Sequence, residues 1–173
     1  LLASKNFKVS NNIKNILIED FSNAIGAEGM LAGQFLDLEA EGKKFKLTLK
    51  KFRKIQEMKT SLLIALCART GAVLGGATKK EKDLLFEFGV ILGRMFQIRD
   101  DILDQEGNEV QMGKKIKKDQ ILNKATIIRL KGINYAKKEL LTLASDAKKK
   151  LNSFKKNTNT LKQLVDYLTV RNY

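Results

Sequence analysis

The chain has 173 residues, enough for one domain with a substantial core, and it carries 33 Lys and Arg against 19 Asp and Glu, a formal charge of +14. It has no histidine, which excludes Ser-His-Asp and Cys-His triads and every histidine-ligated metal site, so any metal would need oxygen ligands, as Mg²⁺, Mn²⁺ and Ca²⁺ prefer. One cysteine allows no internal disulfide and no apolar run is long enough to span a membrane, so we expect a protein of the reducing cytoplasm without stable membrane insertion.

Helical periodicity runs through most of the chain, which contains no proline, and it predicts an all-α fold in a single domain, 1–173. The first helix is expected over roughly 10–40. Within it, "GMLAGQFLDLEAEG" has Gly29 and Gly33 four residues apart, a spacing that allows close contact with another helix. The polar residues that follow share one face, which is either an ordinary solvent-exposed side or the wall of a site. They are Gln34, Asp37 and Glu41.

The second helix is expected to begin after Thr48, as an N-cap, and to run to Gly71. It has an apolar stripe, with Lys59 in its middle, made of Phe52, Ile55, Leu62, Leu63 and Leu66. A lysine on an inward face costs free energy unless it meets an anion, either the carboxylate of a buried salt bridge or a phosphate. Cys67, further along this apolar run, is expected in the core.

A third helix is predicted from "TKKE", residues 78–81, which has the spacing of a capping box, to about Asp104. Near its end, "FQIRDDILD", residues 96–104, places three carboxylates in one of the most apolar segments of the chain. Four polar residues share one face, at i, i+3, i+4 and i+7: Gln97, Asp100, Asp101 and Asp104. A neighbouring face is apolar and consists of Ile91, Met95, Ile98 and Ile102.

Asp100 and Asp104 lie one helical turn apart, and like charges at this spacing repel by roughly a few tenths of a kcal/mol even in water. Partial burial increases the repulsion unless a cation lies between them. A hard divalent cation with carboxylate ligands fits this position. The alternative is a solvated acidic patch that pairs with nearby lysines.

The rest of the chain is expected to form a Lys-rich loop, "QEGNEVQMGKKIKKDQ", a long helix over about 121–152 and a short last helix, "TLKQLVDYLTV". Loop lysines can bind a phosphate as point charges, although a solvated basic loop is the simpler interpretation for Lys115 and Lys117. Possible metal ligands, an inward lysine, loop lysines and a helical cavity with apolar walls together suit a substrate with a diphosphate head and a hydrocarbon tail.

Four segments of the chain resemble motifs of the trans-isoprenyl diphosphate synthases, in the order and approximate spacing of that family: "GQFLDLEAEGK", "KTSLLIALCARTGAVLGGA", "GRMFQIRDDILD" and "GKKIKKDQILNKAT". The similarity is close to the bacterial farnesyl and geranylgeranyl diphosphate synthases, and it covers the chain from about Asn23 to its C-terminus. It implies an isoprenoid-synthase-type bundle of long antiparallel helices around a central cavity, here incomplete. The implied enzyme is a prenyltransferase that condenses isopentenyl diphosphate with dimethylallyl or geranyl diphosphate to give farnesyl or geranylgeranyl diphosphate.

The resemblance also implies a role for individual residues in a Mg²⁺-assisted ionisation, condensation and elimination, with Mn²⁺ as a possible substitute. Asp100 would be the principal metal ligand, and the full metal-binding set would be Asp100, Asp101, Asp104 and Asp119. Thr60 and Gln97 would present oxygens to the developing allylic cation. The implied substrate-binding residues are Lys59, Lys114 and Lys124 for the allylic diphosphate, Gln34 and Asp37 for the allylic site, and Arg171 for closure over isopentenyl diphosphate.

The chain departs from the family pattern in three respects. Ser61 stands where the family usually has glycine, and the loop after "GKK" lacks the family's glycine. The family's first Asp-rich motif, its following arginines and the residues that set product length would all lie upstream of Leu1. We therefore expect this chain to be the C-terminal part of a longer protein, inactive by itself, and its sequence does not predict the product length.

The family resemblance also predicts a homodimer. Two other classes of function compete with a catalytic synthase. A non-catalytic subunit of a heteromeric synthase is disfavoured, because such a subunit has no physical need for three repelling carboxylates. A basic helical nucleic-acid-binding protein is suggested by the charge. It is disfavoured by the inward Lys59 and by composition, because only six of the basic residues are Arg.

Overall fold

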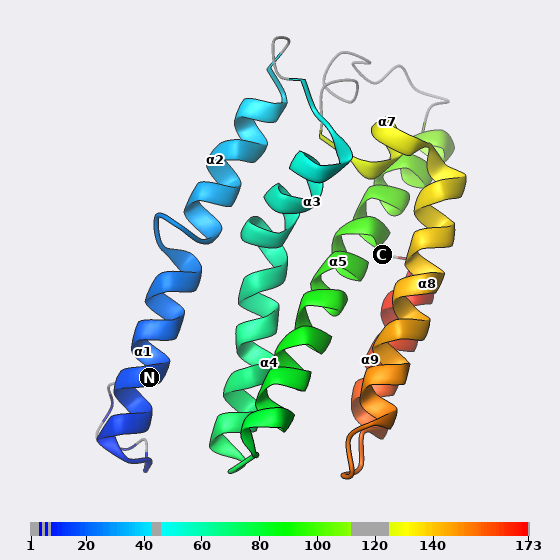
Figure 1. The fold of residues 1–173 in the computed structure, drawn as a ribbon. Helices are drawn as coiled ribbons and strands as arrows, with labels where there is room; N and C mark the ends of the chain where they lie inside the picture. Colours follow the sequence, from blue (N-terminus) through cyan, green and yellow to red (C-terminus); the bar gives the residue numbers. More distant parts are fainter. Residues whose placement is uncertain (1–3, 5, 7, 43–45, 112–124, 173) are drawn as a thin grey trace.

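The computed structural model describes residues 4, 6, 8–42, 46–111 and 125–172, and every regular element in these residues is a helix (Figure 1). This confirms the predicted all-α fold. The elements in chain order are α1 (Asn11–Ile25), α2 (Met30–Ala40), α3 (Leu49–Gln56), the π-helical turn η1 (Glu57–Ser61), α4 (Leu62–Leu74), α5 (Lys79–Gln111), α7 (Ile127–Lys131), α8 (Ile133–Asn152) and α9 (Asn159–Val170).

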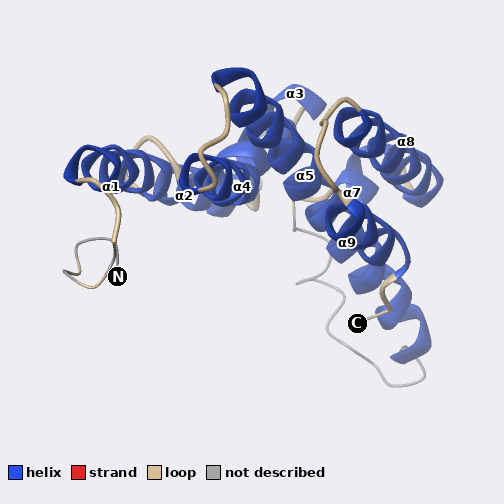
Figure 2. Ribbon diagram, turned by 90° about the horizontal axis from the view of Figure 1, so that it is seen from below, coloured by secondary structure: helices blue, strands red, loops and turns tan. Residues whose placement is uncertain are grey.

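The long helices lie side by side and form an open, curved layer (Figure 2). Helices α1 and α2 lie at one end of this layer, α8 and α9 lie at the other, and α4 and α5 are between them (Figures 1 and 2). The chain reverses direction between α4 and α5 and again between α8 and α9 (Figure 1). The described helices therefore agree with an antiparallel arrangement that is not closed into a ring.

The helix predicted over roughly 10–40 is two helices, which corrects that prediction. The chain leaves α1 at Gly26, whose backbone is extended, and re-enters a helix only after Gly29. A Cβ atom on Gly29 would lie 2.1 Å from the carbonyl oxygen of Ala24, so this turn has no room for a side chain there. The break sets α2 apart from α1 and places it opposite the π-helical turn.

The helix predicted from Thr48 to Gly71 is continuous, but its middle is the π-helical turn η1 and it extends to Leu74. The Thr48 hydroxyl accepts a hydrogen bond from the backbone N–H of Lys51 at 3.2 Å, which confirms the N-cap. The placement of Cys67 in the core is wrong, because its side chain is exposed on α4.

Helix α5 begins with the predicted capping box. The backbone N–H of Thr78 donates to Glu81 at 2.8 Å, and the Thr78 hydroxyl accepts from the backbone N–H of Glu81 at 3.3 Å. The helix extends to Gln111, so the predicted loop begins later than expected. The prediction of a single helix over about 121–152 is also wrong. Gly132, with φ of 84°, separates α7 from α8.

The core is formed where α5 packs between α4 on one side and α8 with α9 on the other. The predicted apolar face of α5 is in it: Met95, Ile98 and Ile102 are buried. Gly89 and Gly93 let α5 approach α4 and η1 closely. A Cβ atom on Gly93 would lie 2.5 Å from the Cα atom of Ser61. The side chain of Ser61 is thus accommodated, fully buried, opposite a residue that has none.

No helix in the described part of the chain is both long enough and apolar enough to cross a membrane.

Candidate active site

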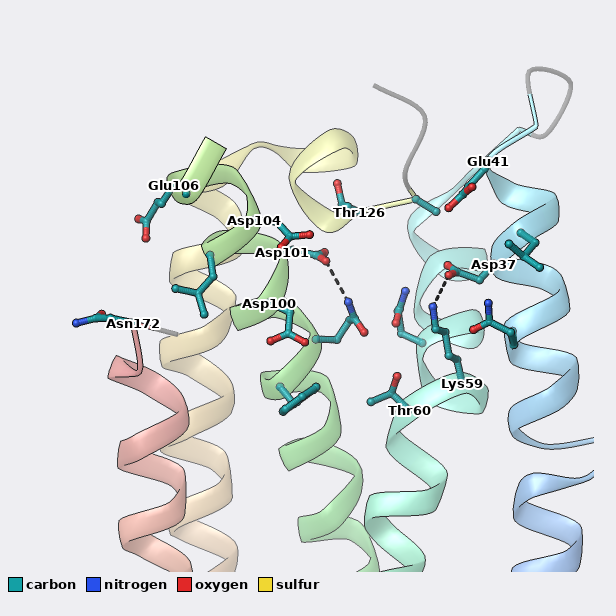
Figure 3. A pocket seen from close by; sticks show the side chains of 18 residues that line it. Asp37, Glu41, Lys59, Thr60, Asp100, Asp101, Asp104, Glu106, Thr126 and Asn172 are labelled. Carbon is teal, nitrogen blue, oxygen red and sulfur yellow. Dashed lines mark hydrogen bonds and ion pairs between the residues drawn. The ribbon is translucent and has the colours of Figure 1, made fainter. Parts of the chain in front are cut away.

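A cleft of about 1090 Å³ lies between α2, η1 and the second half of α5, and the start of α7 and the C-terminal tail border it (Figure 3). Its lining contains eight of the residues that the sequence singled out: Gln34, Asp37, Lys59, Thr60, Gln97, Asp100, Asp101 and Asp104. Glu41, expected on the same face as Asp37, also lines it. The prediction that the acidic face of α5 and Lys59 share one cavity is confirmed. Lys114, Asp119 and Lys124 lie outside the described residues.

Close packing of α2 against η1 builds one wall of the cleft. A Cβ atom on Gly33 would lie 2.3 Å from the backbone nitrogen of Lys59, so only glycine allows α2 to lie this near. Lys59 donates to Asp37 Oδ2 at 2.6 Å, across the contact between the two elements (Figure 3). Of the two alternatives for the anion that meets Lys59, this structure contains the carboxylate.

The π-helical turn places two neighbouring residues, Lys59 and Thr60, on the cleft together. Such single π turns carry an extra residue within a helix and often occur at functional sites. Here the turn interrupts the apolar stripe of α3 and α4 at the point where Lys59 and Thr60 line the cleft. It therefore explains how a lysine fits within that stripe without entering the core.

The opposite wall is the acidic face of α5, and its three aspartates have different surroundings (Figure 3). Asp101 is 6% exposed, Asp100 is half-buried, and Asp104 is exposed. Asp101 Oδ1 accepts from the side-chain amide of Gln97 at 3.1 Å, and its Oδ2 accepts from the backbone N–H of Ile127 at 3.1 Å. Burial raises the pKa of Asp101 to about 6, although both hydrogen bonds oppose the shift.

Asp100 forms an ion pair with Arg171 of the C-terminal tail. Burial raises the pKa of the Asp100 carboxyl, and the Arg171 charge opposes the shift. Further contacts hold the tail in place. Arg99 Nε donates to the carbonyl oxygen of Arg171 at 2.7 Å, Arg99 Nη2 donates to Asn172 Oδ1 at 3.3 Å, and the Arg171 guanidinium lies 4.6 Å from the centre of the Phe96 ring. Arg171 therefore lies beside the site, where it contacts a proposed metal ligand, and its role toward isopentenyl diphosphate stays a prediction.

The donor atoms of this wall fit a hard cation such as Mg²⁺. They are carboxylate oxygens, and Asp100 and Asp104 line the same cleft one turn apart on α5. Among the described residues, no three acidic or cysteine side chains lie together as a ready-made metal site. Mg²⁺ is usually held by one or two carboxylates, water and the phosphates of a substrate rather than by an all-protein cage. The arrangement therefore fits a cation that binds together with a phosphorylated ligand.

Several lining residues were missed by the sequence analysis, notably Gln56, Glu106 and Thr126. Gln56 is 5% exposed, and within the described residues its Oε1 has no hydrogen-bond partner. Its position three residues before Lys59 on the same helix face is a signal that could have found it. Thr126 offered no such signal, because only the tertiary fold brings the start of α7 to the cleft.

Comparisons with a family model and with curated proteins point to the same family. A family model described as Polyprenyl synthetase matches residues 1–168. The chain is 34% identical over 157 residues to a farnesyl diphosphate synthase of Bacillus subtilis (strain 168), an alignment that covers 91% of this chain and 52% of that protein. It is 42% identical over 133 residues to a farnesyl diphosphate synthase of Geobacillus stearothermophilus, covering 77% of this chain and 44% of that protein.

Solved structures have the same fold. An apo FPP/GFPP synthase from Zymomonas mobilis superposes with a TM-score of 0.82 at 28% identity, over 96% of this chain and 55% of that one. A geranyltransferase from Helicobacter pylori, complexed with magnesium and isoprenyl diphosphate, superposes with a TM-score of 0.74 at 29% identity, over 94% of this chain and 53% of that one. The chain thus spans about half the length of the curated relatives that it matches.

Proposed function

Because this chain belongs to the polyprenyl synthetase family, we propose that the protein is an isoprenyl diphosphate synthase. It condenses isopentenyl diphosphate with dimethylallyl or geranyl diphosphate to give farnesyl or geranylgeranyl diphosphate. The observation that supports this best is the cleft itself, where Lys59 on η1 lies across from the carboxylates of α5. This arrangement offers a cation for a diphosphate on one wall and oxygen ligands for a metal on the other.

Lys59 binds the diphosphate of the allylic substrate. Its ion pair with Asp37 holds the ammonium group in the cleft before a substrate arrives. When a diphosphate replaces Asp37 as partner, the positive charge stabilises the negative charge that grows on the leaving group. Asp37 and Gln34, on α2, then border the same allylic site.

Asp100 and Asp104 would hold Mg²⁺, with Mn²⁺ as a possible substitute. Asp101, which the family resemblance also implies as a ligand, has both carboxylate oxygens hydrogen-bonded to the protein. When bound, the cation neutralises the charge of the diphosphate and so favours its departure. Arg171 must leave Asp100 for this ligand to become available, and its release frees a guanidinium for isopentenyl diphosphate. Lys114, Lys124 and Asp119, which lie outside the described residues, are proposed to assist as the family resemblance implies.

In the reaction, the bond between the allylic carbon and the diphosphate oxygen breaks, and the diphosphate leaves with the electron pair. The double bond of isopentenyl diphosphate attacks the resulting cation, a new carbon–carbon bond forms, and a proton passes to the released diphosphate. Thr60 and Gln97 line the cleft and present oxygens to the cation. Leu38, Phe96 and Leu103 supply apolar surface in the cleft. Water must be excluded during the reaction, because it would otherwise quench the cation to an alcohol.

Homodimer formation and a cytoplasmic location stay predictions of the sequence. The activity is tested with the longest natural form of the protein that contains this chain, incubated with Mg²⁺, labelled isopentenyl diphosphate and each allylic primer in turn. We expect a lengthened prenyl diphosphate, lost on chelation of the metal and in Lys59→Ala but retained in Lys54→Ala, which removes an exposed lysine of α3. Activity that appears only after a second, different subunit is added would instead favour the non-catalytic subunit.

A further inference from the structure

Asp101 differs from its two neighbours because both of its oxygens are already engaged by the protein. Oδ1 accepts from Gln97 Nε2 and Oδ2 accepts from the Ile127 backbone, each at 3.1 Å. The side chain is almost fully buried, whereas Asp104 is exposed. A carboxylate is costly to bury unless it is hydrogen-bonded, and these two bonds offset that cost.

The contact with Gln97 settles the orientation of an amide. A carboxamide has a donor end and an acceptor end, and only the NH₂ group can donate to a carboxylate. Asp101 therefore holds the NH₂ of Gln97 toward itself and leaves Oε1 as the end that Asp101 does not engage. Gln97 lines the cleft, so this choice decides which end of the amide is available to a ligand there.

The contact with Ile127 connects α5 to the start of α7. The first N–H groups of a helix have no partner within the helix, and Asp101 supplies one for Ile127, the first residue of α7. Thr126, the N-cap residue beside it, lines the cleft. One buried carboxylate thus fixes both a side chain and a piece of backbone on the same wall.

Resting on the proposed function, we propose that Asp101 is a positioning residue: it orients the Gln97 carboxamide so that its oxygen faces the reacting allylic carbon, and the cation is held by Asp100 and Asp104. Asp101→Asn tests this directly. The Ile127 N–H is a fixed donor, so the Asn oxygen must turn toward it and the Asn NH₂ must face Gln97. Gln97 then has to rotate its oxygen toward Asn and its NH₂ into the cleft.

The first readout does not depend on activity. In ¹⁵N NMR spectra, one side-chain amide hydrogen of Gln97, assigned with Gln97→Met, is expected to be shifted downfield and to exchange slowly because it is bonded to a carboxylate. Asp101→Asn should remove this signature. Mn²⁺ binding, followed by electron paramagnetic resonance with inorganic diphosphate present, should weaken no more than in Glu41→Gln, which removes one charge from the cleft lining without contacting Gln97.

The second readout is kinetic and uses the longest natural form of the protein. Asp101→Asn should lower kcat by on the order of tenfold to a hundredfold with little change in KM, as for loss of one positioned dipole. In a Gln97→Met background the same change should have little further effect, because Asp101 acts through Gln97. Multiplying effects of the two substitutions would overturn the proposal, as would a loss of Mn²⁺ affinity equal to that of Asp100→Asn. A protein that shows the NMR signature but no prenyl transfer would refute the proposed function and leave the role of Asp101 in orienting Gln97 standing.

Discussion

Asp100 and Asp104 are one helical turn apart on α5, yet the structure gives them different environments, and their substitution should have different effects. Asp100→Ala in the full-length protein should lower turnover by orders of magnitude and raise the Mg²⁺ requirement, because this half-buried carboxylate faces the cleft beside the tail. Asp104→Ala should be milder, because an exposed carboxylate can act through a water molecule. Turnover measured over a Mg²⁺ titration checks both, and small, equal losses would mean that the acidic face is only a solvated surface.

The ion pair between Arg171 and Asp100 leads to a second prediction at this scale. Mn²⁺ must displace the guanidinium to reach Asp100, so Arg171→Ala should strengthen the binding of Mn²⁺ alone, by about threefold to tenfold, or roughly 1 kcal/mol, as for one partly exposed pair. The same variant should lose activity, because the guanidinium is no longer available to isopentenyl diphosphate. Calorimetric titration with Mn²⁺ measures the effect, and Lys155→Ala, an exposed lysine outside the cleft, is the control. Unchanged or weaker Mn²⁺ binding in Arg171→Ala would show that the pair does not compete with the metal.

What the sequence predicts about single residues depends on how local their partners are. The shared face of Gln97, Asp100, Asp101 and Asp104 follows from helical spacing alone, and the structure confirms that all four line one cleft. The hydrogen bond from Ile127 to Asp101 joins residues 26 positions apart, so no local pattern reveals it. The partner of Lys59 was left open between a carboxylate and a phosphate for the same reason.

Among the helices, the contact between α2 and η1 depends on a single missing side chain. Gly33→Ala would place a methyl group 2.3 Å from the backbone nitrogen of Lys59, so the two elements must separate. We expect a loss of about 1–3 kcal/mol in the free energy of unfolding, as for overpacking, together with weaker diphosphate binding because Lys59 moves. Gly71→Ala, on α4 with no atom within 4 Å of the added methyl group, is the matched control and should stabilise the fold by roughly 0.5–1 kcal/mol. Urea unfolding curves measure both, and equal effects would show that the close approach is not tight.

Local signals located helix starts better than they located interruptions. The caps at Thr48 and Thr78 involve residues three apart in sequence, and both were predicted correctly. The π-helical turn and the break at Gly132 were not, because packing against other helices can override the helical preference of a sequence. The turn between α1 and α2 carried a signal, Gly26 and Gly29. The sequence analysis instead paired Gly29 with Gly33 as a helix contact, and of these two only Gly33 packs against another helical element.

At the scale of the whole molecule, the open layer of helices leaves apolar side chains on α2 in contact with solvent. Leu31 and Phe35, one turn apart, are each 62% exposed. Residues 1–173 alone should therefore self-associate as their concentration rises, because exposed apolar patches promote association. The double change Leu31→Gln and Phe35→Gln should shift the onset of association to an at least roughly fivefold higher concentration.

Sedimentation velocity over a concentration series measures this association. Leu141→Gln on α8 is the control, since Leu141 is equally exposed at the opposite end of the layer. An equal effect of the control would mean that association does not depend on the α2 surface.

The described lining of the cleft has a charge opposite to that of the chain. The protein carries a formal charge of +14, yet of the charged residues that line the cleft in the described part of the chain, six are acidic and one is basic. The basic exterior attracts a diphosphate from solution, whereas these six acidic side chains repel it at close range unless a cation arrives first or with it. The charge of the lining thus sets the order in which metal and diphosphate bind. At low Mg²⁺, the initial rate should follow the concentration of the magnesium–diphosphate complex, and added metal-free diphosphate substrate should compete poorly with that complex for the cleft.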